Sequence, residues 1–433
     1  MPAGDPLRSS RPPLGPEASS PAVGLARPQT GAPLLGMLLV TLMAGCDLPQ
    51  GTMMPDLKRS DEGLALPADQ LDGGLLPAVR GGLTGSTELK IGLSVAQAEV
   101  AFQVTVLTSV GTVDLKPGAT YRVRRSGSNL VLASNAGDLL TDPAPLAVRP
   151  AAAGSLSFNE RRYRGAFQFI AAPGTTDKLT LVNQVLTEDY LYGVLPAEMA
   201  TGWPQEALKS QAVAARTYAL AHLGRRAALG FDLFDTTADQ VYKGFTSEKQ
   251  DCSAAVDATR GQVLTYQEKP ISAFFHASSG GETDDALAVW GENLPYIQGV
   301  KDLDPSPHAS WTSTFTAPQV KAALSDLGQE VGDLKELTVT TYTPHGRARW
   351  LKARGSTGEA TVDANKLRMK LSLKSTRYKL LAGNGSFKFD GGGWGHGLGL
   401  SQWGARTYAT QGQAYQDILA KYYAQTTLTT LAQ

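Results

Sequence analysis

The sequence has few cysteines and no excess of either charge. Only two cysteines, Cys46 and Cys252, occur in its 433 residues. Two thiols cannot form a disulfide framework, and without other ligands they cannot complete the tetrahedral set of a structural zinc site; a single bridge between them is left open. Lysine plus arginine and aspartate plus glutamate both total 40, so the chain lacks the basic footprint that is typical of nucleic-acid-binding proteins. We therefore expect no nucleic-acid partner.

Several familiar catalytic motifs are also missing. The sequence contains no His-Glu-x-x-His zinc motif, no Gly-x-Ser-x-Gly nucleophile turn and no phosphate-binding P-loop. The glycine-rich stretch at 391–399 has leucine where a dinucleotide-binding loop needs its third glycine. Cys252 could act as a nucleophile only with His276 or His396 as its base. Nothing beside Cys252 indicates activation, and burial as a small apolar residue is the more common state of a free cysteine.

The N-terminal region has the pattern of an export signal followed by a tether. An apolar run at 32–45 has signal-peptide length, is too short to span a bilayer comfortably and is preceded by arginines. It ends in Leu42-Met43-Ala44-Gly45-Cys46, which resembles a bacterial lipobox, where the cysteine thiol carries a lipid anchor. An ordinary cleaved signal and a short anchor helix are the alternatives, and all three export the protein. We predict a lipoprotein-type signal peptide at 1–46 and a flexible tether at 47–87.

The rest of the chain is rich in strand patterns. With 42% hydrophobic and 18% charged residues, the chain can bury one large core or two ordinary ones. Short runs of β-branched and aromatic residues between turn formers predict strands at 89–93, 100–106, 121–124, 130–132, 166–170 and 179–185. Two more strands are predicted at 262–266 and 271–276, before a turn at Gly280-Gly281, and residues 334–379 are again β-rich in pattern.

Helix signals are fewer but clear. Pro204 suits the first turn of a helix, which we expect at 204–223, with many alanines that let neighbouring backbone approach closely. The glycine loop at 391–399 leads into a helix capped by Ser401, and a second helix should end near Tyr423. Together these patterns predict a β-rich α+β fold.

One long segment carries a specific family signature. It runs Glu188-Asp-Tyr-Leu-Tyr-Gly-Val-Leu-Pro-Ala-Glu198-Met-Ala-Thr-Gly-Trp-Pro-Gln-Glu-Ala-Leu-Lys209-Ser-Gln-Ala-Val-Ala-Ala-Arg216-Thr-Tyr-Ala-Leu and closely resembles the SpoIID/LytB domain. Further pieces follow in the family's order: Tyr163-Arg-Gly165, Asp239-Gln-Val-Tyr-Lys-Gly244, Gly280-Gly-Glu-Thr283, Val289-Trp-Gly291, Pro295-Tyr296 and Gly395-His-Gly-Leu-Gly-Leu-Ser-Gln-Trp-Gly-Ala405. The resemblance covers about 88–430, with a β-rich part at 88–190, a glutamate-helix segment at 191–224 and a mixed and glycine-loop part at 225–430.

This resemblance implies both a fold and an activity. The expected fold is a β-rich, SpoIID-like α+β domain with helices flanking an elongated cleft. The expected activity is that of a lytic transglycosylase, which cleaves MurNAc–GlcNAc bonds of peptidoglycan glycan strands to anhydro-muramyl ends, with Glu198 as the catalytic residue. Members of the sporulation branch prefer glycan stripped of its stem peptides. The protein would act outside the cytoplasm, as a membrane-anchored lipoprotein or secreted to the cell envelope.

Two other functions remain open from the same resemblance. LytB-type members are regarded as enhancers of a cell-wall amidase, so the chain could be a non-catalytic enhancer of an N-acetylmuramoyl-L-alanine amidase or a wall-binding protein. Some relatives also bind zinc through a histidine and nearby cysteines just before the Gly-Gly turn. Here His276 is retained, but Ser279 stands at a cysteine position and no cysteine follows. We therefore predict no metal and no cofactor.

The residues around Glu198 suit the catalytic role. Cleavage of a glycosidic bond needs a proton donor at the leaving oxygen, and a carboxyl keeps its proton near neutral pH only where its surroundings disfavour the anion. The neighbours Leu195, Pro196, Ala197 and Met199 are compatible with such surroundings. A hydrolase would need a second acid, whereas in a lytic enzyme the same glutamate can then accept a proton from the sugar's C6 hydroxyl. The alternative is that Glu198 ties down the start of the next helix.

Lys209 and Arg216 are candidates for substrate binding on the predicted helix. They are seven residues apart and so fall on nearly the same side of it. They would hold substrate oxygens or carboxylates, or else brace the glutamate loop or form an exposed cationic edge. The excess of lysine and arginine at 334–379 indicates either a solvated strand face or a contact with anionic wall polymer.

Four residues outside that helix complete the candidate site. His396 and Gln402 would line the cleft from the glycine loop, and the alternative for His396 is packing within the loop. Tyr296 and Trp290 offer apolar ring faces of the kind on which sugars stack, although aromatic residues more often belong to the core.

Overall fold

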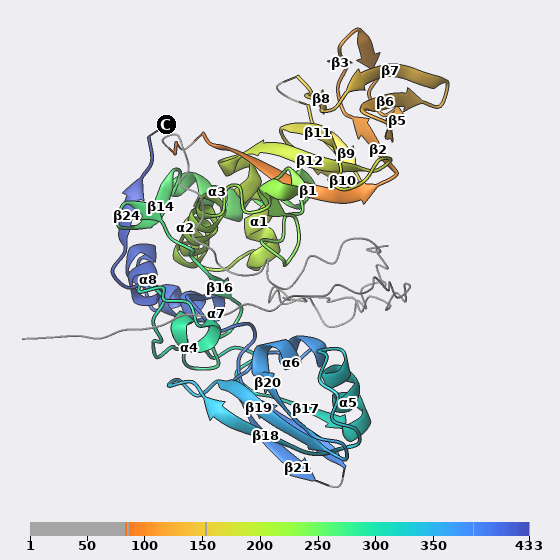
Figure 1. The fold of residues 1–433 in the computed structure, drawn as a ribbon. Coiled ribbons are helices and arrows are strands. Elements are labelled where there is room, and N and C mark those ends of the chain that lie inside the picture. Colours follow the sequence, from red (N-terminus) through yellow and green to blue (C-terminus); the bar gives the residue numbers. More distant parts are fainter. Residues whose placement is uncertain (1–82, 85, 152–153, 384, 433) are drawn as a thin grey trace, which may run out of the picture. The chain divides into compact units, whose positions relative to one another are not determined.

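The structure, a computed structural model, describes residues 83–84, 86–151, 154–383 and 385–432 (Figure 1). The predicted signal peptide at 1–46, its Cys46 and most of the predicted tether at 47–87 lie outside the described residues. Among the described residues, no helix combines the length and apolar character needed to cross a membrane. Several sheets are combined with a smaller set of helices, so the predicted β-rich α+β fold is confirmed.

Two sheets contain most strands of the N-terminal part. One has five strands in the order β13-β1-β12-β11-β8, and the other has six in the order β10-β9-β2-β5-β6-β7. The members are β1 (Glu88–Gln97), β2 (Glu99–Val104), β5 (Thr120–Ser126), β6 (Asn129–Ser134), β7 (Gly137–Pro143), β8 (Leu146–Val148), β9 (Leu156–Phe158), β10 (Arg161–Tyr163), β11 (Ala166–Ala171), β12 (Leu179–Leu186) and β13 (Leu233–Phe234). A separate hairpin consists of β3 (Thr108–Val110) and β4 (Val113–Leu115). All the strands predicted between 89 and 185 are confirmed.

Hydrophobic patterning explains how these strands lie. In β2, Val100, Phe102 and Val104 are buried and alternate with more exposed residues, so one face packs into the core. Strand β12 lies between β1 and β11 and is buried along most of its length. It pairs antiparallel with β1 from its first residue to its last. The chain therefore leaves the sheet at a fixed point, directly before helix α1.

Two helices follow β12 without another strand between them. They are α1 (Thr187–Glu198) and α2 (Gln205–Ala221). Helix α2 confirms the helix predicted at 204–223, and Pro204 directly precedes its first residue. Helix α1 is absent from our prediction, because it contains aromatic and β-branched residues and has Pro196 in its last turn. Nine of its residues are buried, and this tertiary packing outweighs the poor local propensity.

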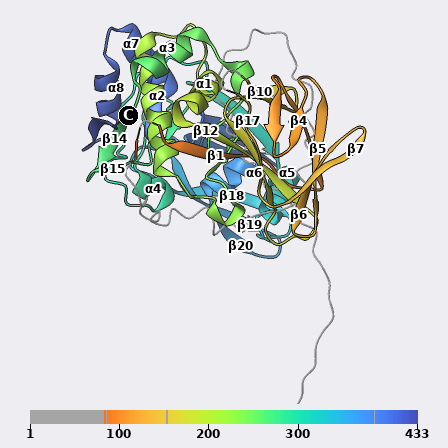
Figure 2. The same ribbon diagram turned by 90° about the horizontal axis from the view of Figure 1, so that it is seen from above.

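Helix α2 is the element around which the other helices gather. It contacts α1, α3 (Gln250–Ala258), α7 (Gln402–Thr410) and α8 (Tyr415–Tyr422), as both views show (Figures 1 and 2). Its alanines at 212, 214, 215 and 219 are fully buried, and their small side chains permit this close packing. The predicted cap is also confirmed, since the Ser401 side chain accepts a hydrogen bond from the Gly404 N–H at 3.2 Å.

Short elements complete this part of the chain. They are β14 (Gln262–Tyr266), β15 (Lys269–Pro270), β16 (Phe275–His276), β23 (Leu400–Ser401), β24 (Thr427–Thr430), α4 (Ala286–Trp290), η2 (Ala227–Leu229) and η3 (Phe245–Ser247). Strand β14 confirms the prediction at 262–266. The strand predicted at 271–276 is wrong except at its end, where β16 pairs with β23. Before that, the N–H groups of Ala273 and Phe274 bond carbonyls two residues back, at 2.8 Å, which is a turn geometry.

A second hydrophobic core lies within residues 311–391. Its elements are β17 (Trp311–Thr316), α5 (Ala317–Ser325), β18 (Leu334–Tyr342), β19 (Ala348–Gly355), β20 (Glu359–Asp363), α6 (Ala364–Lys370), β21 (Tyr378–Gly383) and β22 (Ser386–Gly391). The sheets β17-β22-β21 and β18-β19-β20 bury a set of residues that is separate from the main core. The β-rich pattern at 334–379 is thus confirmed, with α6 added. The first and last residues of this segment, Trp311 and Gly391, are strand partners.

Candidate active site

Glu198 is the last residue of α1 and is only 7% exposed. Its Oε1 accepts a hydrogen bond from the backbone N–H of Val241 at 3.2 Å. Burial raises the pKa of Glu198 from its ordinary 4.5 to about 7, and hydrogen bonds from Val241 and Gln402 and the charge of Lys243 offset only part of that rise. A carboxyl with this pKa carries its proton in a large fraction of molecules near neutral pH, as a general acid requires.

The segment that contains Val241, the hydrogen-bond donor to Glu198, lies against α1. The N–H of Lys243 donates to the Gly193 carbonyl at 3.3 Å, and the N–H of Tyr242 donates to the Asp235 carbonyl at 3.1 Å. Gly193 permits this approach, since a Cβ on it would lie 2.7 Å from the Tyr242 ring. These contacts fix the backbone beside Val241, whose N–H donates to Glu198.

Sequence reasoning missed two contributors to this site. Val241 and Lys243 belong to the stretch 239–244, which the sequence analysis used only as part of the family resemblance. Val241 acts through its backbone N–H and Lys243 through its charge. Neither effect has a sequence signal of its own, because both depend on which loop the fold brings to the end of α1.

A second carboxylate in this region, that of Asp239, forms an ion pair with Arg226. Asp239 and Glu198 both raise the pKa values of the buried Tyr190 and Tyr218, in addition to the larger effect of burial. The Asp239 side chain is 0% exposed and pairs with Arg226 at 3.3 Å. It is therefore neutralised within the protein and is not placed to activate a water molecule.

Arg216 is fully buried and supports α1. Its Nε and Nη2 donate to the two carboxylate oxygens of Glu188 at 2.9 and 2.7 Å. The guanidinium also donates to the backbone carbonyls of Gln262 and Val256. Since Glu188 is in the first turn of α1, Arg216 occupies the bracing position that the sequence analysis gave as the alternative to substrate binding.

Lys209 lies nearer the surface of the same helix. Its Nζ is 2.7 Å from Glu206 Oε1, and its side chain is 24% exposed. The ammonium also lies 5.8 Å from the ring centre of Tyr415, at the start of α8. These contacts direct Lys209 toward α8.

The glycine loop and its helix bring Gln402 to Glu198. Gln402 begins α7, is 2% exposed and hydrogen-bonds to Glu198. His396 in the same loop uses both ring nitrogens within the protein. Its Nδ1 accepts from the Leu398 N–H at 3.0 Å, so Nε2 carries the hydrogen and donates to the Phe275 carbonyl at 2.9 Å. Burial lowers the pKa of His396 to about 3, which keeps the ring neutral.

Tyr296 and Trp290 pack within the main core. The Tyr296 ring is 5.7 Å from that of Tyr266, and its hydroxyl accepts from the Ser272 N–H at 3.3 Å. Trp290 packs against Phe274 with ring centres 4.8 Å apart. Tyr296 is 8% exposed, so its geometry matches the core role that the sequence analysis left open.

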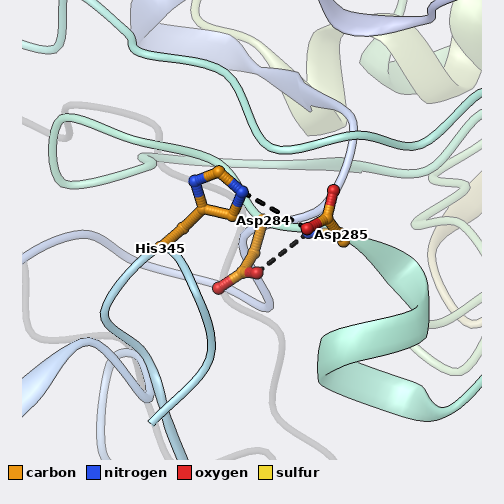
Figure 3. Close-up of side chains that lie close together, drawn as sticks. All are labelled: Asp284, Asp285 and His345. Carbon is orange, nitrogen blue, oxygen red and sulfur yellow. Dashed lines mark hydrogen bonds and ion pairs between the residues drawn. The ribbon is translucent and has the colours of Figure 1, made fainter.

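One group of side chains has the spacing of metal ligands. Ligand atoms of Asp284, Asp285 and His345 lie within 4.8 Å of one another (Figure 3). The two His345 nitrogens are 3.3 Å from Asp285 and 3.1 Å from Glu282, and Arg347 Nε is 4.0 Å from Asp284. Burial opposes protonation of His345, but the three carboxylates raise its pKa overall. Since His345 and Arg347 supply positive charge to these carboxylates, we interpret the group as an ion-pair cluster.

The residues just before the Gly280-Gly281 turn make hydrogen bonds within the protein. The Ser279 hydroxyl donates to Asp302 at 2.7 Å. The Nδ1 of His276 lies 3.1 Å from the Leu398 carbonyl, and burial lowers the pKa of this histidine well below its ordinary value. Cys252, the cysteine within the described residues, is buried on α3.

Family models match two parts of the chain. The model described as stage II sporulation protein matches residues 175–266, and a domain of unknown function, DUF8618, matches residues 298–399. The first range contains α1, α2 and Glu198, and the second contains the second core. The first match therefore covers part of the main core, and the second contains the whole second core.

Relatives extend this similarity over more than half of the chain. Stage II sporulation protein D of Bacillus amyloliquefaciens is 33% identical over 262 residues, which are 56% of this chain and 74% of that protein. Its namesake in Bacillus subtilis is 30% identical over 288 residues, covering 60% and 80% of the two chains. The amidase enhancer of Bacillus subtilis is 30% identical over 290 residues, covering 55% of this chain and 40% of that protein. The predicted family is thus confirmed, and the chain belongs to the SpoIID family.

Proposed function

We propose that this protein is a lytic transglycosylase that cleaves the MurNAc–GlcNAc bond of peptidoglycan, with Glu198 as acid and base. The observation that carries the proposal is the buried Glu198 carboxyl, whose pKa is about 7. The names of its relatives, stage II sporulation protein D and amidase enhancer, support a role at the cell wall. Action there requires export, which the predicted lipoprotein-type signal ending at Cys46 would provide.

The reaction needs one group that first gives and then takes a proton. Protonated Glu198 donates to the glycosidic oxygen, and the bond between that oxygen and C1 of the muramic acid breaks. The C6 hydroxyl oxygen then bonds to C1, and its proton passes to Glu198, which yields a 1,6-anhydro end and restores the carboxyl. Between these steps the Val241 N–H and the Gln402 side chain stabilise the carboxylate. Because Arg226 holds Asp239, a one-carboxylate route suits the site better than a pair.

The test is product analysis with and without the carboxyl group. Wild-type protein is expected to release anhydro-muramyl fragments from purified glycan, and Glu198→Gln is expected to lower the rate at least about 10²-fold, since acid-base catalysis contributes about 10²–10⁴-fold. Mass spectrometry of the released fragments gives both the rate and the product type. Glu99→Gln, an exposed change on β2, is the matched control and should retain full activity. Hydrolysed ends without the anhydro form, or an active Glu198→Gln, would refute the proposed mechanism.

The rate of this reaction is expected to fall as the pH rises above about 7. Glu198 must begin each turnover protonated, and the protonated fraction of a carboxyl falls about tenfold per pH unit above its pKa. Between pH 8 and 9, kcat/KM should therefore fall about tenfold. Initial rates from pH 5 to 9, with circular dichroism to confirm that the protein stays folded, measure the profile. A profile that is flat or rises through this range is inconsistent with Glu198 as the acid.

A second candidate function rests on the relative named amidase enhancer. In this case the protein binds the wall or an amidase and does not cleave glycan. The same digestion, run with and without an added N-acetylmuramoyl-L-alanine amidase, separates the two functions. Folded protein that releases no glycan fragments alone but accelerates the amidase supports the enhancer.

A further inference from the structure

One side of helix α7 lines a cavity that the proposed mechanism does not use. Trp403, Arg406, Thr407 and Thr410 follow the i, i+3, i+4, i+7 spacing that places side chains on one helix face. Together with Pro305 and Gln411 they line a cavity of about 290 Å³. This volume is near the lower end of small-molecule sites.

Two residues that line this cavity carry hydrogen-bond donors with no acceptor among the described residues. Trp403 is 5% exposed, and its indole Nε1 is buried without a hydrogen-bond partner. The Arg406 guanidinium lies over the rings of Trp403 and Trp203, at 4.6 and 5.3 Å from the ring centres. It makes contacts with these rings, and no ion pair joins it to a carboxylate of the described chain. A buried donor without an acceptor is unfavourable, so a ligand that supplies an acceptor binds more tightly.

The donors select a carboxylate. A guanidinium binds carboxylate oxygens in a planar, two-pronged geometry, and the two indole rings beneath Arg406 pack against its guanidinium. The Thr407 and Thr410 hydroxyls donate to the helix carbonyls of Trp403 and Arg406, at 2.9 and 2.8 Å. Their oxygens keep lone pairs that can accept hydrogen bonds from hydroxyl groups of a ligand. The cavity thus offers donors for an anion beside acceptors for a sugar.

Two contacts relate the residues of this cavity to Glu198. Trp403 follows Gln402, whose side chain hydrogen-bonds to Glu198. Trp203, five residues after Glu198 in the sequence, packs edge-on against Trp403 with ring centres 5.2 Å apart. A ligand group in the cavity would therefore be bound by the helix whose first residue, Gln402, contacts Glu198.

We propose that Arg406 and the Trp403 Nε1–H form a subsite for a carboxylate carried by the glycan strand. The ligand identity rests on the proposed function, whereas the preference for a carboxylate rests on the cavity itself. In peptidoglycan this chemistry has two sources. One is the lactyl carboxylate of muramic acid after its peptide has been removed, and the other is a carboxylate of an intact stem peptide.

The test is binding of the full chain, carrying Glu198→Gln to prevent cleavage, to three glycan preparations. These are peptide-free strands, the same strands with their carboxylates converted to neutral amides, and strands with intact stem peptides. We expect amidation to weaken binding at least about tenfold and Arg406→Gln to weaken binding to untreated strands by a similar factor, because either change removes a charge-assisted, two-pronged contact. Arg149→Gln, an exposed change elsewhere, should bind as the parent does.

Comparison of the three preparations shows which of the two carboxylates binds at the subsite. Arg406-dependent binding to peptide-free strands assigns the lactyl carboxylate, and Arg406-dependent binding only to intact strands assigns the stem peptide. Equal binding of untreated and amidated strands with no tighter binding of intact strands, unchanged binding of every preparation by folded Arg406→Gln, or no binding to any strand overturns the subsite. If Arg406→Gln does not fold, the amidation arm still decides, because it leaves the protein unchanged. Carboxylate-dependent binding by a wild-type protein that releases no fragments would support the subsite and reject the proposed activity.

Discussion

Replacing Glu188 with glutamine is expected to lower the free energy of unfolding by about 3–5 kcal/mol, because the change leaves the Arg216 guanidinium buried without its counter-charge. The side chains of Arg216 and Glu188 are 1% and 5% exposed. The backbone N–H of Gly261 also donates to Glu188 at 3.1 Å. The two carbonyls that remain to Arg216 are neutral and cannot replace the lost charge. Urea denaturation of the full chain at pH 7 measures the effect.

An exposed ion pair provides the matched control for this change. Asp333 is 87% exposed at its side chain and pairs with Lys321, so Asp333→Asn should change the free energy of unfolding far less than Glu188→Gln does. The double change Glu188→Gln with Arg216→Met should recover part of the loss, because no charge then stays buried. If Glu188→Gln costs no more than Asp333→Asn, the buried pair does not support α1.

Glu198→Gln is expected to stabilise the protein at high pH, although it should lower the rate of the proposed reaction. The folded-state pKa of Glu198 is raised from 4.5 to about 7, so between these values the folded chain holds a proton that the unfolded chain has lost. Stability of the wild type therefore falls as the pH rises from about 4.5 to about 7, by about 3 kcal/mol in total. Glutamine does not titrate, so the variant avoids this loss. Its advantage should be small below pH 5 and reach about 3 kcal/mol above pH 7.

Denaturant unfolding of both proteins at pH 5 and pH 8 measures this difference. Glu99→Gln, on an exposed part of β2, should show no such dependence on pH. A difference that is equal at both pH values would mean that Glu198 is not held in surroundings that disfavour its charge. This experiment also separates the catalytic role from the alternative in which Glu198 anchors the following helix, because loss of an anchor destabilises the protein at pH 8.

Local patterns in the sequence predicted the elements whose signals are themselves local. A run of β-branched and aromatic residues located β2, and Ser401 located the start of α7, because both signals lie within a few residues of the element. Helix α1 escaped prediction because its stability comes from burial against other elements and not from propensity. Helix α5 had a readable signal that we did not use, since Thr316 and Gln319 form a capping box before it.

The candidate site was predictable only where a motif names the residue. Glu198 was identified from its family signature, and the structure adds the burial that raises its pKa. The same signature suggested substrate contacts for Arg216, but its charge is used by Glu188, a partner 28 residues earlier in the chain. The sequence analysis did not identify Arg406, because its contact with Trp203 joins residues that are far apart in the sequence. Side chains that act through distant partners need the fold to be known.

Because Trp311 pairs with Gly391, the segment that contains the second core begins and ends at neighbouring positions. Segments with adjacent ends can be exchanged, lengthened or removed without stretching the structure on either side. The residues between these two positions can thus be exchanged as one unit. Its sequence can change over evolutionary time at a different pace from the scaffold that holds Glu198, and one scaffold can acquire a new accessory surface without rebuilding its interior.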